Sequence, residues 1–472
     1  MHIINYLGVT IIGKLVPVAS IFLYSHFMSV QDYGVLNLAA SYLWIFGIIM
    51  TLNLHTGVGR YIYTDHGDFV IFLGTTLIAI TVIFVVCCVF VGIEIGNIEL
   101  LMGLPRNVIV LVLILVVGSI AESIFTQIAI HGQKSSQLFR VVCSKALGTL
   151  ALSISLLLLI EHDKYLAILY ADALANVLLI IYVSLAFRSK VQFTFNLSHL
   201  AYMIKYSVPL IPYMLCLTLL SQFDRVMIDH FFGKEETGLY SLAYNVGIML
   251  MMVVTALLNA FTPAFYDAIA KKDYSGLARD SKAIFALSVL VTSVLVLFGE
   301  EIFQLLVPAK YASALDLIPV VAIGGLSLVI FQIWVRVIAY ANQTYLISII
   351  AVSATGLKIG LNLLLLPIYG YKVAAVTTIA AYLLMSLSCV FVLNRVIRLF
   401  KVNILYELVY FGVLVVVMSL FRSLNFTLLV EYLLKVIFLV LIVLSLTPTF
   451  SASWQRGRQS IRLGNALTEI ER

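Results

Sequence analysis

Charged residues are scarce in this chain of 472 residues, where Asp, Glu, Lys and Arg together make up only 11% of the sequence. A typical soluble domain carries about 25%. Hydrophobic residues make up 62%, and the mean hydropathy is +1.09. So little charge excludes an ordinary water-soluble fold. Nearly every stretch of about 20 residues is apolar enough to cross the hydrocarbon of a bilayer as a helix, which predicts an all-α integral membrane protein.

Motifs for metal, cofactor or covalent chemistry are also lacking. The 8 histidines form no HxxxH or HxH pair, and the 5 cysteines show no metal-site spacing, so neither a metal nor another cofactor is expected. The absence of a GxxxxGK[ST] phosphate loop disfavours an ATP-driven pump. The longest predicted outer loop, GIEIGNIELLMGLPRN, has no paired catalytic groups beyond Glu94 and Glu99. We therefore expect a transporter rather than an enzyme.

Polar interruptions divide the sequence into about 14 predicted membrane helices. They begin near residues 3, 34, 69, 107, 138, 164, 207, 238, 281, 316, 345, 372, 403 and 427. With the N-terminus inside, most Lys and Arg residues outside the helices fall on the cytoplasmic side, where basic loops are retained. Both termini are therefore predicted to be cytoplasmic.

Two segments of the chain resemble one another. QDYGVLNLAASY begins at Gln31 and EETGLYSLAYNV begins at Glu235, which aligns Gly34 with Gly238. The repeat predicts two parallel six-helix lobes, with a substrate site near midplane between them. The expected domains are an N-lobe at 1–200, a C-lobe at 201–402, a C-terminal helix pair at 403–450 and a basic cytoplasmic tail at 451–472.

Prolines fall within the leading helix of both predicted lobes. Pro17 lies inside the first helix, and Pro209 and Pro212 lie in the first turns of the seventh. Proline removes a helical hydrogen bond, so both helices are expected to bend. A moving gate and a packing kink explain such bends equally well.

The residues also resemble a known family. DRVMIDHFFGKEETGLYSLAYNV resembles the seventh-to-eighth-helix signature of the polysaccharide transport proteins, the lipid-linked O-antigen repeat-unit flippases. FMSVQDYGVLNLAASYLWIFGIIMTLNLHTGVGRYI is similar to the opening segment of that family, and Arg60 lies at its end. The resemblance implies a fold like that of multidrug and toxin exporters (MATE-like).

The same resemblance implies a function and a location. A member would move a polyprenyl-pyrophosphate-linked oligosaccharide, such as an O-antigen, capsule or exopolysaccharide repeat unit, from the cytoplasmic to the outer leaflet by alternating access. It would lie in the bacterial cytoplasmic (inner) membrane among membrane lipids, with polysaccharide polymerase or chain-length machinery as candidate partners. A nucleic-acid partner is not expected. The alternatives are a MATE-like drug or cation antiporter and, in third place, a membrane polysaccharide polymerase or ligase.

Basic residues inside predicted helices are the candidate substrate ligands. Each costs roughly 2.5–3.5 kcal/mol at a helix centre, so it must face a cavity, a partner or an interface. We expect Lys14, Lys145, Arg336 and Lys358 to line a cationic cavity for the pyrophosphate, and the resemblance adds Arg60.

Acidic residues inside the helices have other candidate roles. For Glu122 and Asp172, ion pairing, with Lys145 as a candidate partner of Asp172, and proton coupling are both open. Asp224, Arg225 and Asp229 are expected to form an outer-rim site in which Arg225 and Asp229, four residues apart, pair. The same spacing predicts a structural pair between Glu431 and Lys435.

Overall fold

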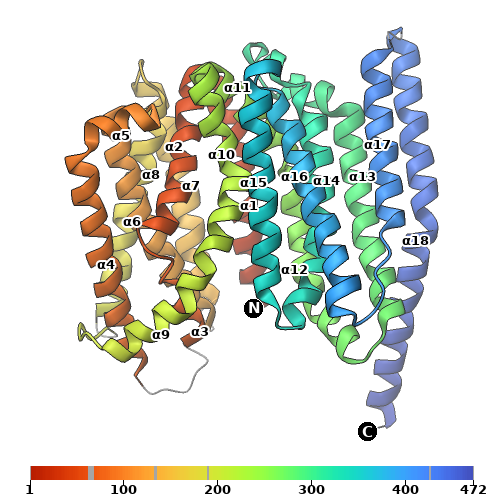
Figure 1. Cartoon of the computed structure of the whole chain (residues 1–472), viewed down its shortest axis with the longest axis horizontal. Helices are drawn as coiled ribbons and strands as arrows, with labels where there is room; N and C mark the ends of the chain where they lie inside the picture. Colours follow the sequence, from red (N-terminus) through yellow and green to blue (C-terminus); the bar gives the residue numbers. More distant parts are fainter. Residues whose placement is uncertain (1, 62–67, 132–134, 189–190, 425–426, 471–472) are drawn as a thin grey trace. The chain divides into compact units, whose positions relative to one another are not determined.

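The computed structural model describes residues 2–61, 68–131, 135–188, 191–424 and 427–470, and within these ranges every regular element is helical. The N-terminal half contains α1 (His2–Phe27), α2 (Val30–Ile49), α3 (Thr56–Tyr61), α4 (Phe69–Ile93), α5 (Ile95–Met102), α6 (Arg106–His131), α7 (Ser135–Leu159), α8 (Tyr165–Phe187), α9 (Leu197–Ser207), α10 (Ile211–Phe232) and α11 (Lys234–Gly247). The C-terminal half contains α12 (Met249–Ala270), α13 (Tyr274–Leu306), α14 (Leu317–Tyr340), α15 (Thr344–Tyr369), α16 (Val373–Val392), α17 (Leu405–Ser423) and α18 (Leu428–Ile470) (Figure 1).

The described residues contain 12 helices that are long and apolar enough to cross a membrane, which confirms a multi-span helical membrane protein. The predicted total of 14 stays a prediction. The other two expected helices, from residues 3 and 238, fall on α1 and on α11 with α12, and some of their side chains lie outside the described part.

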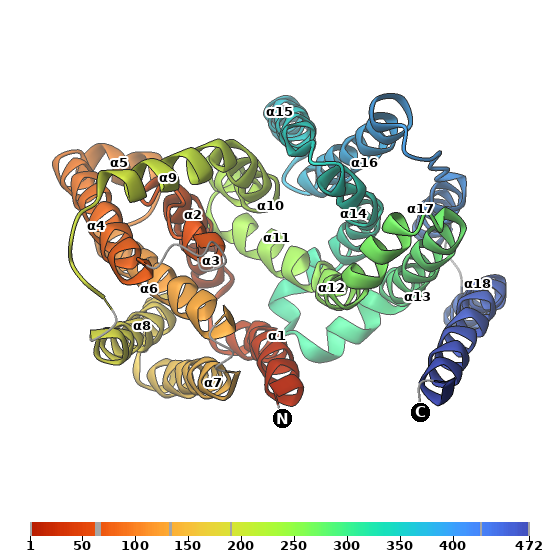
Figure 2. The same ribbon diagram turned by 90° about the horizontal axis from the view of Figure 1, so that it is seen from below.

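The chain divides into two compact units. The first contains Met1–Leu242 and Leu366–Tyr371, and the second contains Ala243–Leu365 and Lys372–Arg472. Within the first unit, α1 packs along α7, α6 packs on α8, and α10 packs on α2 (Figure 2). In this division α10 belongs with the preceding helices. The lobe boundary expected near residue 200 stays a prediction.

The aligned glycines of the two repeats lie against each other in the first unit. A Cβ atom on Gly34 would lie 1.9 Å from the carbonyl oxygen of Lys234, and a Cβ atom on Gly238 would lie 2.1 Å from the carbonyl oxygen of Val30. Each glycine thus meets the residue four positions before the other. Only glycine allows the backbones of α2 and α11 to approach so closely.

Two predicted helices are interrupted. The seventh is split by a 3₁₀ turn, Val208–Leu210, between α9 and α10, which confirms the bend expected from Pro209 and Pro212. The second, expected to begin near residue 34, ends at Ile49, and the chain passes through left-handed backbone at Leu52 and Asn53 before α3, where Arg60 lies. No proline causes this second break.

In the second unit, α14 is the central helix. It packs against α13 and α16, and most of its residues are buried. The last helix, α18, packs on α13, where Lys435 forms an ion pair with Glu431 at 2.8 Å and a second one with Glu301. The predicted pair between Glu431 and Lys435 is confirmed, and Glu301 is an additional member.

Candidate functional site

A polar cavity opens within the first unit. Its volume is about 440 Å³, and its walls are formed by α1, α2, α6, α7 and α8. Three ionisable side chains that the sequence indicated, Glu122, Lys145 and Asp172, line it together with the proline of α1, Pro17. Uncharged polar side chains also line it, namely those of Ser20, Tyr24, Tyr33, Asn37 and Thr149, and apolar residues form the rest of the walls.

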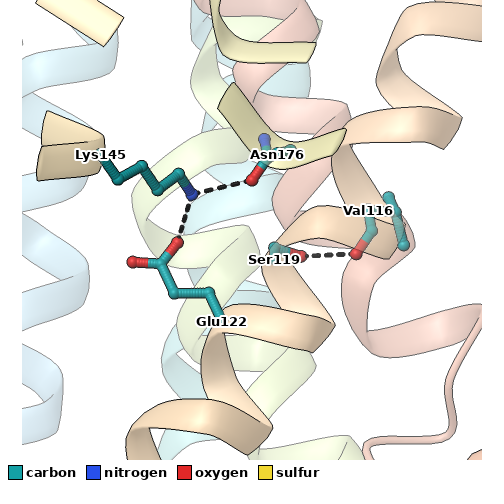
Figure 3. A network of polar contacts seen from close by, with 5 residues as sticks. All are labelled: Val116, Ser119, Glu122, Lys145 and Asn176. Carbon is teal, nitrogen blue, oxygen red and sulfur yellow. Dashed lines mark hydrogen bonds and ion pairs between the residues drawn. The ribbon is translucent and has the colours of Figure 1, made fainter. Parts of the chain in front are cut away.

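Lys145 forms the centre of a polar network beside this cavity. Its Nζ atom lies 2.5 Å from Oε2 of Glu122 and donates a hydrogen bond of 2.8 Å to Oδ1 of Asn176 (Figure 3). The three residues come from α7, α6 and α8, respectively. The Lys145 side chain is 20% exposed and that of Glu122 is 38% exposed, so the ion pair borders the cavity rather than lying in a dry core.

A glycine makes room for this network. Asn176 is 6% exposed and packs against α6 at Gly118, where a Cβ atom would lie only 2.3–2.5 Å from the side-chain atoms of Asn176. One turn further along α6 lies Glu122, so one helix supplies both the space for Asn176 and the carboxylate for Lys145. Gly118 therefore allows Asn176 to lie close to α6, where it and Glu122 both contact Lys145.

Replacing Gly118 by alanine is expected to displace Asn176 and break its bond to Lys145. Overpacking of this kind typically costs about 1–3 kcal/mol. The measurement is thermal unfolding of the purified protein in detergent, together with transport. Gly148→Ala on α7 is the matched control, because nothing lies within 4 Å of its new Cβ atom. Equal stability of both variants would contradict the packing described here.

Asp172 lies in the same cavity but not in the network. Within the described residues it has no hydrogen bond or ion pair, whereas Lys145 pairs with Glu122. Of the two candidate partners, Lys145 therefore takes Glu122 and not Asp172. The described lining of the cavity holds two carboxylates and one ammonium group, an acidic balance that the basic residues of the sequence did not predict.

Lys145 is also accessible from a second hollow. A groove of about 570 Å³ between α7 and α8 is lined by Lys145 and Thr149, which both line the cavity as well. Most of the remaining groove wall is apolar, with Leu174 and Leu178 among its exposed side chains. One ammonium group thus borders both the cavity and the groove.

In the second unit, Lys358 lies in a buried polar stripe of α15. Thr355, Lys358 and Asn362 occupy one face of the helix, because they are spaced three and four residues apart. Lys358 is 2% exposed and Asn362 is 1% exposed. Asn362 accepts a hydrogen bond of 2.5 Å from the hydroxyl of Thr377 on α16. Each unit therefore contains a lysine near an asparagine within its helices.

The remaining predicted cations occupy different places. Arg336 on α14 is half-buried and donates to the backbone carbonyl of Gln332 and to Oγ1 of Thr262 at 3.3 Å. Arg60 on α3 is exposed, and its guanidinium carbon lies 4.8 Å from the ring centroid of Tyr206. The side chain of Lys14 lies outside the described residues. A single cavity shared by all five cations stays a prediction.

The charges of α10 differ from their expected arrangement. Asp229 does not pair with Arg225: its Oδ2 atom lies 2.6 Å from Nζ of Lys234, and the pair packs beside Gly103. Lys234 prevails because Gly233 ends the helix and turns the next residue back toward the carboxylate.

Asp224 and Arg225 are both buried, and their position at the outer rim stays a prediction. Asp224 accepts a hydrogen bond of 2.6 Å from the hydroxyl of Tyr240, and Arg225 donates to Gln222 at 3.0 Å. Gln222 in turn accepts a bond from Ser41 of α2. These contacts connect α10 with α2 and α11.

Proteins of known sequence and structure resemble this chain. A family model described as "Polysaccharide biosynthesis protein" matches residues 2–269. Protein 1 of the Lsg locus of Haemophilus influenzae is 25% identical over 275 residues, which cover 57% of this chain and 66% of that protein. The match therefore spans just under two thirds of that relative's length.

Solved structures show the same fold. The lipid II flippase MurJ, in an inward closed conformation, has a TM-score of 0.70 at 12% identity, with 96% of this chain and 99% of that chain covered. An inward-facing multidrug resistance transporter of the MATE family and MOP superfamily has a TM-score of 0.59 at 12% identity, with 88% and 95% covered. The predicted MATE-like fold is confirmed.

Proposed function

Because the chain belongs to the polysaccharide biosynthesis protein family, we propose that it is a flippase for a lipid-linked oligosaccharide. The substrate is a polyprenyl-pyrophosphate-linked repeat unit of an O-antigen, capsule or exopolysaccharide. The protein moves it from the cytoplasmic to the outer leaflet by alternating access. The bacterial inner membrane is its location, and the basic loops of the sequence support cytoplasmic termini.

The observation that carries the proposal is the polar cavity around Lys145. Charged groups inside membrane helices are costly and mark substrate or ion pathways. Here Lys145, Asn176 and Glu122 present both donors and acceptors at or beside a cavity of about 440 Å³. Sugar hydroxyl groups need both. The cavity therefore suits the oligosaccharide head of the substrate, while the polyprenyl chain requires apolar surroundings.

The pyrophosphate has its own candidate ligands among the cations. Glu122 already neutralises Lys145, so Lys145 binds a phosphate only when it leaves the carboxylate. The other candidate ligands of this proposal are Lys14, Arg60, Arg336 and Lys358. Polysaccharide polymerase or chain-length machinery would act on the product after translocation.

Reconstitution tests this proposal directly. The purified protein is placed in liposomes with a fluorescent polyprenyl-pyrophosphate-linked oligosaccharide, and a membrane-impermeant quencher reports which leaflet holds the label. We expect protein-dependent movement between leaflets that a lipid without sugar does not match. Movement no faster than in protein-free liposomes would reject the proposal.

A second candidate function follows from the acidic balance of the cavity. Among the described lining residues, Glu122 and Asp172 outnumber Lys145, and Asp172 has no ion-pair partner in the described part of the chain. Such an arrangement suits a cation antiporter of the MATE type or a proton-coupled flippase. A cationic dye in the same liposomes distinguishes them, because only the antiporter exports it.

Replacing Asp172 by asparagine is expected to remove the dependence of transport on a proton gradient. Asparagine keeps the shape but cannot bind and release a proton. A proton gradient should accelerate transport by the unaltered protein. The transport rate of the Asp172→Asn variant with the gradient should stay within about twofold of the same variant's rate without it. Asn37→Ala, which alters a neutral group of the same cavity, serves as the control. A gradient response that persists in Asp172→Asn would exclude this carboxylate as the proton carrier.

A further inference from the structure

The loop that follows α16 has an unusual backbone. The helix ends in a π-helical turn, Leu393–Ile397, and the next residue, Arg398, has a φ angle of 53° in the left-handed region. Left-handed backbone at a residue other than glycine is unfavourable and persists only where surrounding contacts impose it.

Two anchors impose this conformation. Nδ2 of Asn394 donates a hydrogen bond of 2.9 Å to the carbonyl of Val402, and Oδ1 of Asn394 accepts one of 2.8 Å from the backbone nitrogen of Val402. The ring of Phe400 stacks on Tyr274 at a centroid distance of 4.6 Å and lies 6.3 Å from Trp334. The loop is therefore closed at its base and fixed to α13 and α14.

The fixed loop gathers three positive charges around one hollow. Arg395, Arg398 and Lys401 line a recess of about 500 Å³ together with Asn394 and Phe400. Within the described ranges none of these cations forms an ion pair with a carboxylate. Arg398 donates from Nε to the backbone carbonyl of Arg395 at 2.8 Å, which fixes the Arg398 side chain against the turn.

We propose that this recess binds the anionic phosphate headgroup of a membrane lipid. The loop directly follows a membrane-spanning helix, Val373–Ile397, so it lies at headgroup level. Three clustered cations repel one another unless an anion neutralises them, and guanidinium groups match phosphate oxygens well. The topology of the loop explains why basic residues occur here. It does not require the clamp formed by the two Asn394–Val402 hydrogen bonds, the left-handed Arg398 or the recess.

Lipid binding to the full-length protein tests the site. Native mass spectrometry of the purified protein, titrated with phosphatidylglycerol or with phosphatidylcholine, measures how many lipids remain bound. Each cation near a membrane surface contributes about 1 kcal/mol, or roughly fivefold in affinity. The variant Arg395→Gln/Arg398→Asn/Lys401→Gln, with asparagine at the left-handed position, should lose about 100-fold in affinity for phosphatidylglycerol. Equal retention of both lipids by the unaltered protein would overturn the proposal.

Two comparisons separate a site from general charge. Lys205→Gln removes an exposed cation from α9 and should leave phosphatidylglycerol binding unchanged, whereas Arg395→Gln alone should lower it about fivefold. Inorganic phosphate should compete only at much higher concentration than the lipid. If phosphate binds as tightly as phosphatidylglycerol, the ligand is a soluble anion and the lipid assignment is wrong.

The clamp gives an independent test, with Asn394 as a positioning residue. Asn394→Ala keeps all three charges but releases both bonds to Val402. We expect several-fold weaker phosphatidylglycerol binding and less discrimination against phosphatidylcholine, with only a small fall in the melting temperature of the protein, because the change removes two hydrogen bonds of a surface loop. Full binding and discrimination in Asn394→Ala would show that charge alone, and not the fixed recess, attracts the lipid.

Discussion

Replacing Lys145 by methionine is expected to reduce polysaccharide export at least tenfold. The change leaves the Glu122 carboxylate and Oδ1 of Asn176 without the donor that both now share. Breaking a fully buried ion pair costs about 3–5 kcal/mol, whereas an exposed pair is worth about 1 kcal/mol or less. With Glu122 38% exposed, we expect a loss of stability between these limits, about 1–3 kcal/mol. Surface polysaccharide and the melting temperature in detergent measure the two effects.

A charge exchange separates the structural role of Lys145 from its role in transport. Lys145→Glu combined with Glu122→Lys restores an ion pair, so stability should return while export stays low if the ammonium group on α7 contacts the substrate. Arg140→Met on the same helix is the control, because this exposed arginine bonds only to the carbonyl of Ser136 among the described residues. Normal export by correctly inserted Lys145→Met would exclude the lysine as a substrate ligand.

Replacing Gly238 by alanine is expected to disrupt the packing of α11 on α2. The new methyl group would lie 2.1 Å from the carbonyl oxygen of Val30 and 3.1 Å from the nitrogen of Gly34. Both neighbours are backbone atoms, so no side chain can turn aside, and a helix must shift. Overpacking costs about 1–3 kcal/mol where side chains can adjust, and we expect a cost above this range here. The yield of folded protein and its melting temperature give the measurement.

A glycine-to-alanine substitution at another position, Gly47 on α2, provides the control. Nothing lies within 4 Å of a Cβ atom on Gly47, so Gly47→Ala should be neutral or slightly stabilising, as alanine favours helices over glycine by about 1 kcal/mol. Gly34→Ala should resemble Gly238→Ala. Equal melting temperatures of Gly34→Ala, Gly47→Ala and Gly238→Ala would contradict the close approach of α2 and α11.

Composition predicted the class of fold and hydropathy predicted most of the helices, because the cost of exposing polar backbone in lipid leaves few alternatives. Proline predicted the break before α10. The break after Ile49 was missed, since it arises from left-handed backbone at Leu52 and Asn53, which no residue type there requires. Tertiary contacts decide such breaks more than local preference does.

The site was predictable to a similar degree. Lys145, Glu122 and Asp172 stood out because charge is rare in apolar segments, and they do line one cavity. Which carboxylate pairs with Lys145 depends on the rotation of three helices about their axes, which the sequence leaves undetermined. Asn176 and Asn362 were missed because an uncharged amide in an apolar segment gives a weak signal. The close fit of Asn176 against Gly118 appears only in three dimensions.

The contact between Gly34 and Gly238 is reciprocal. Gly34 approaches Lys234 as Gly238 approaches Val30, and in each pair the contacted residue lies four positions before the opposite glycine. A contact in which two equivalent surfaces meet reciprocally is the kind that joins identical subunits across a two-fold axis. Because each glycine faces the backbone around the other, each limits which substitutions the opposite helix can accept.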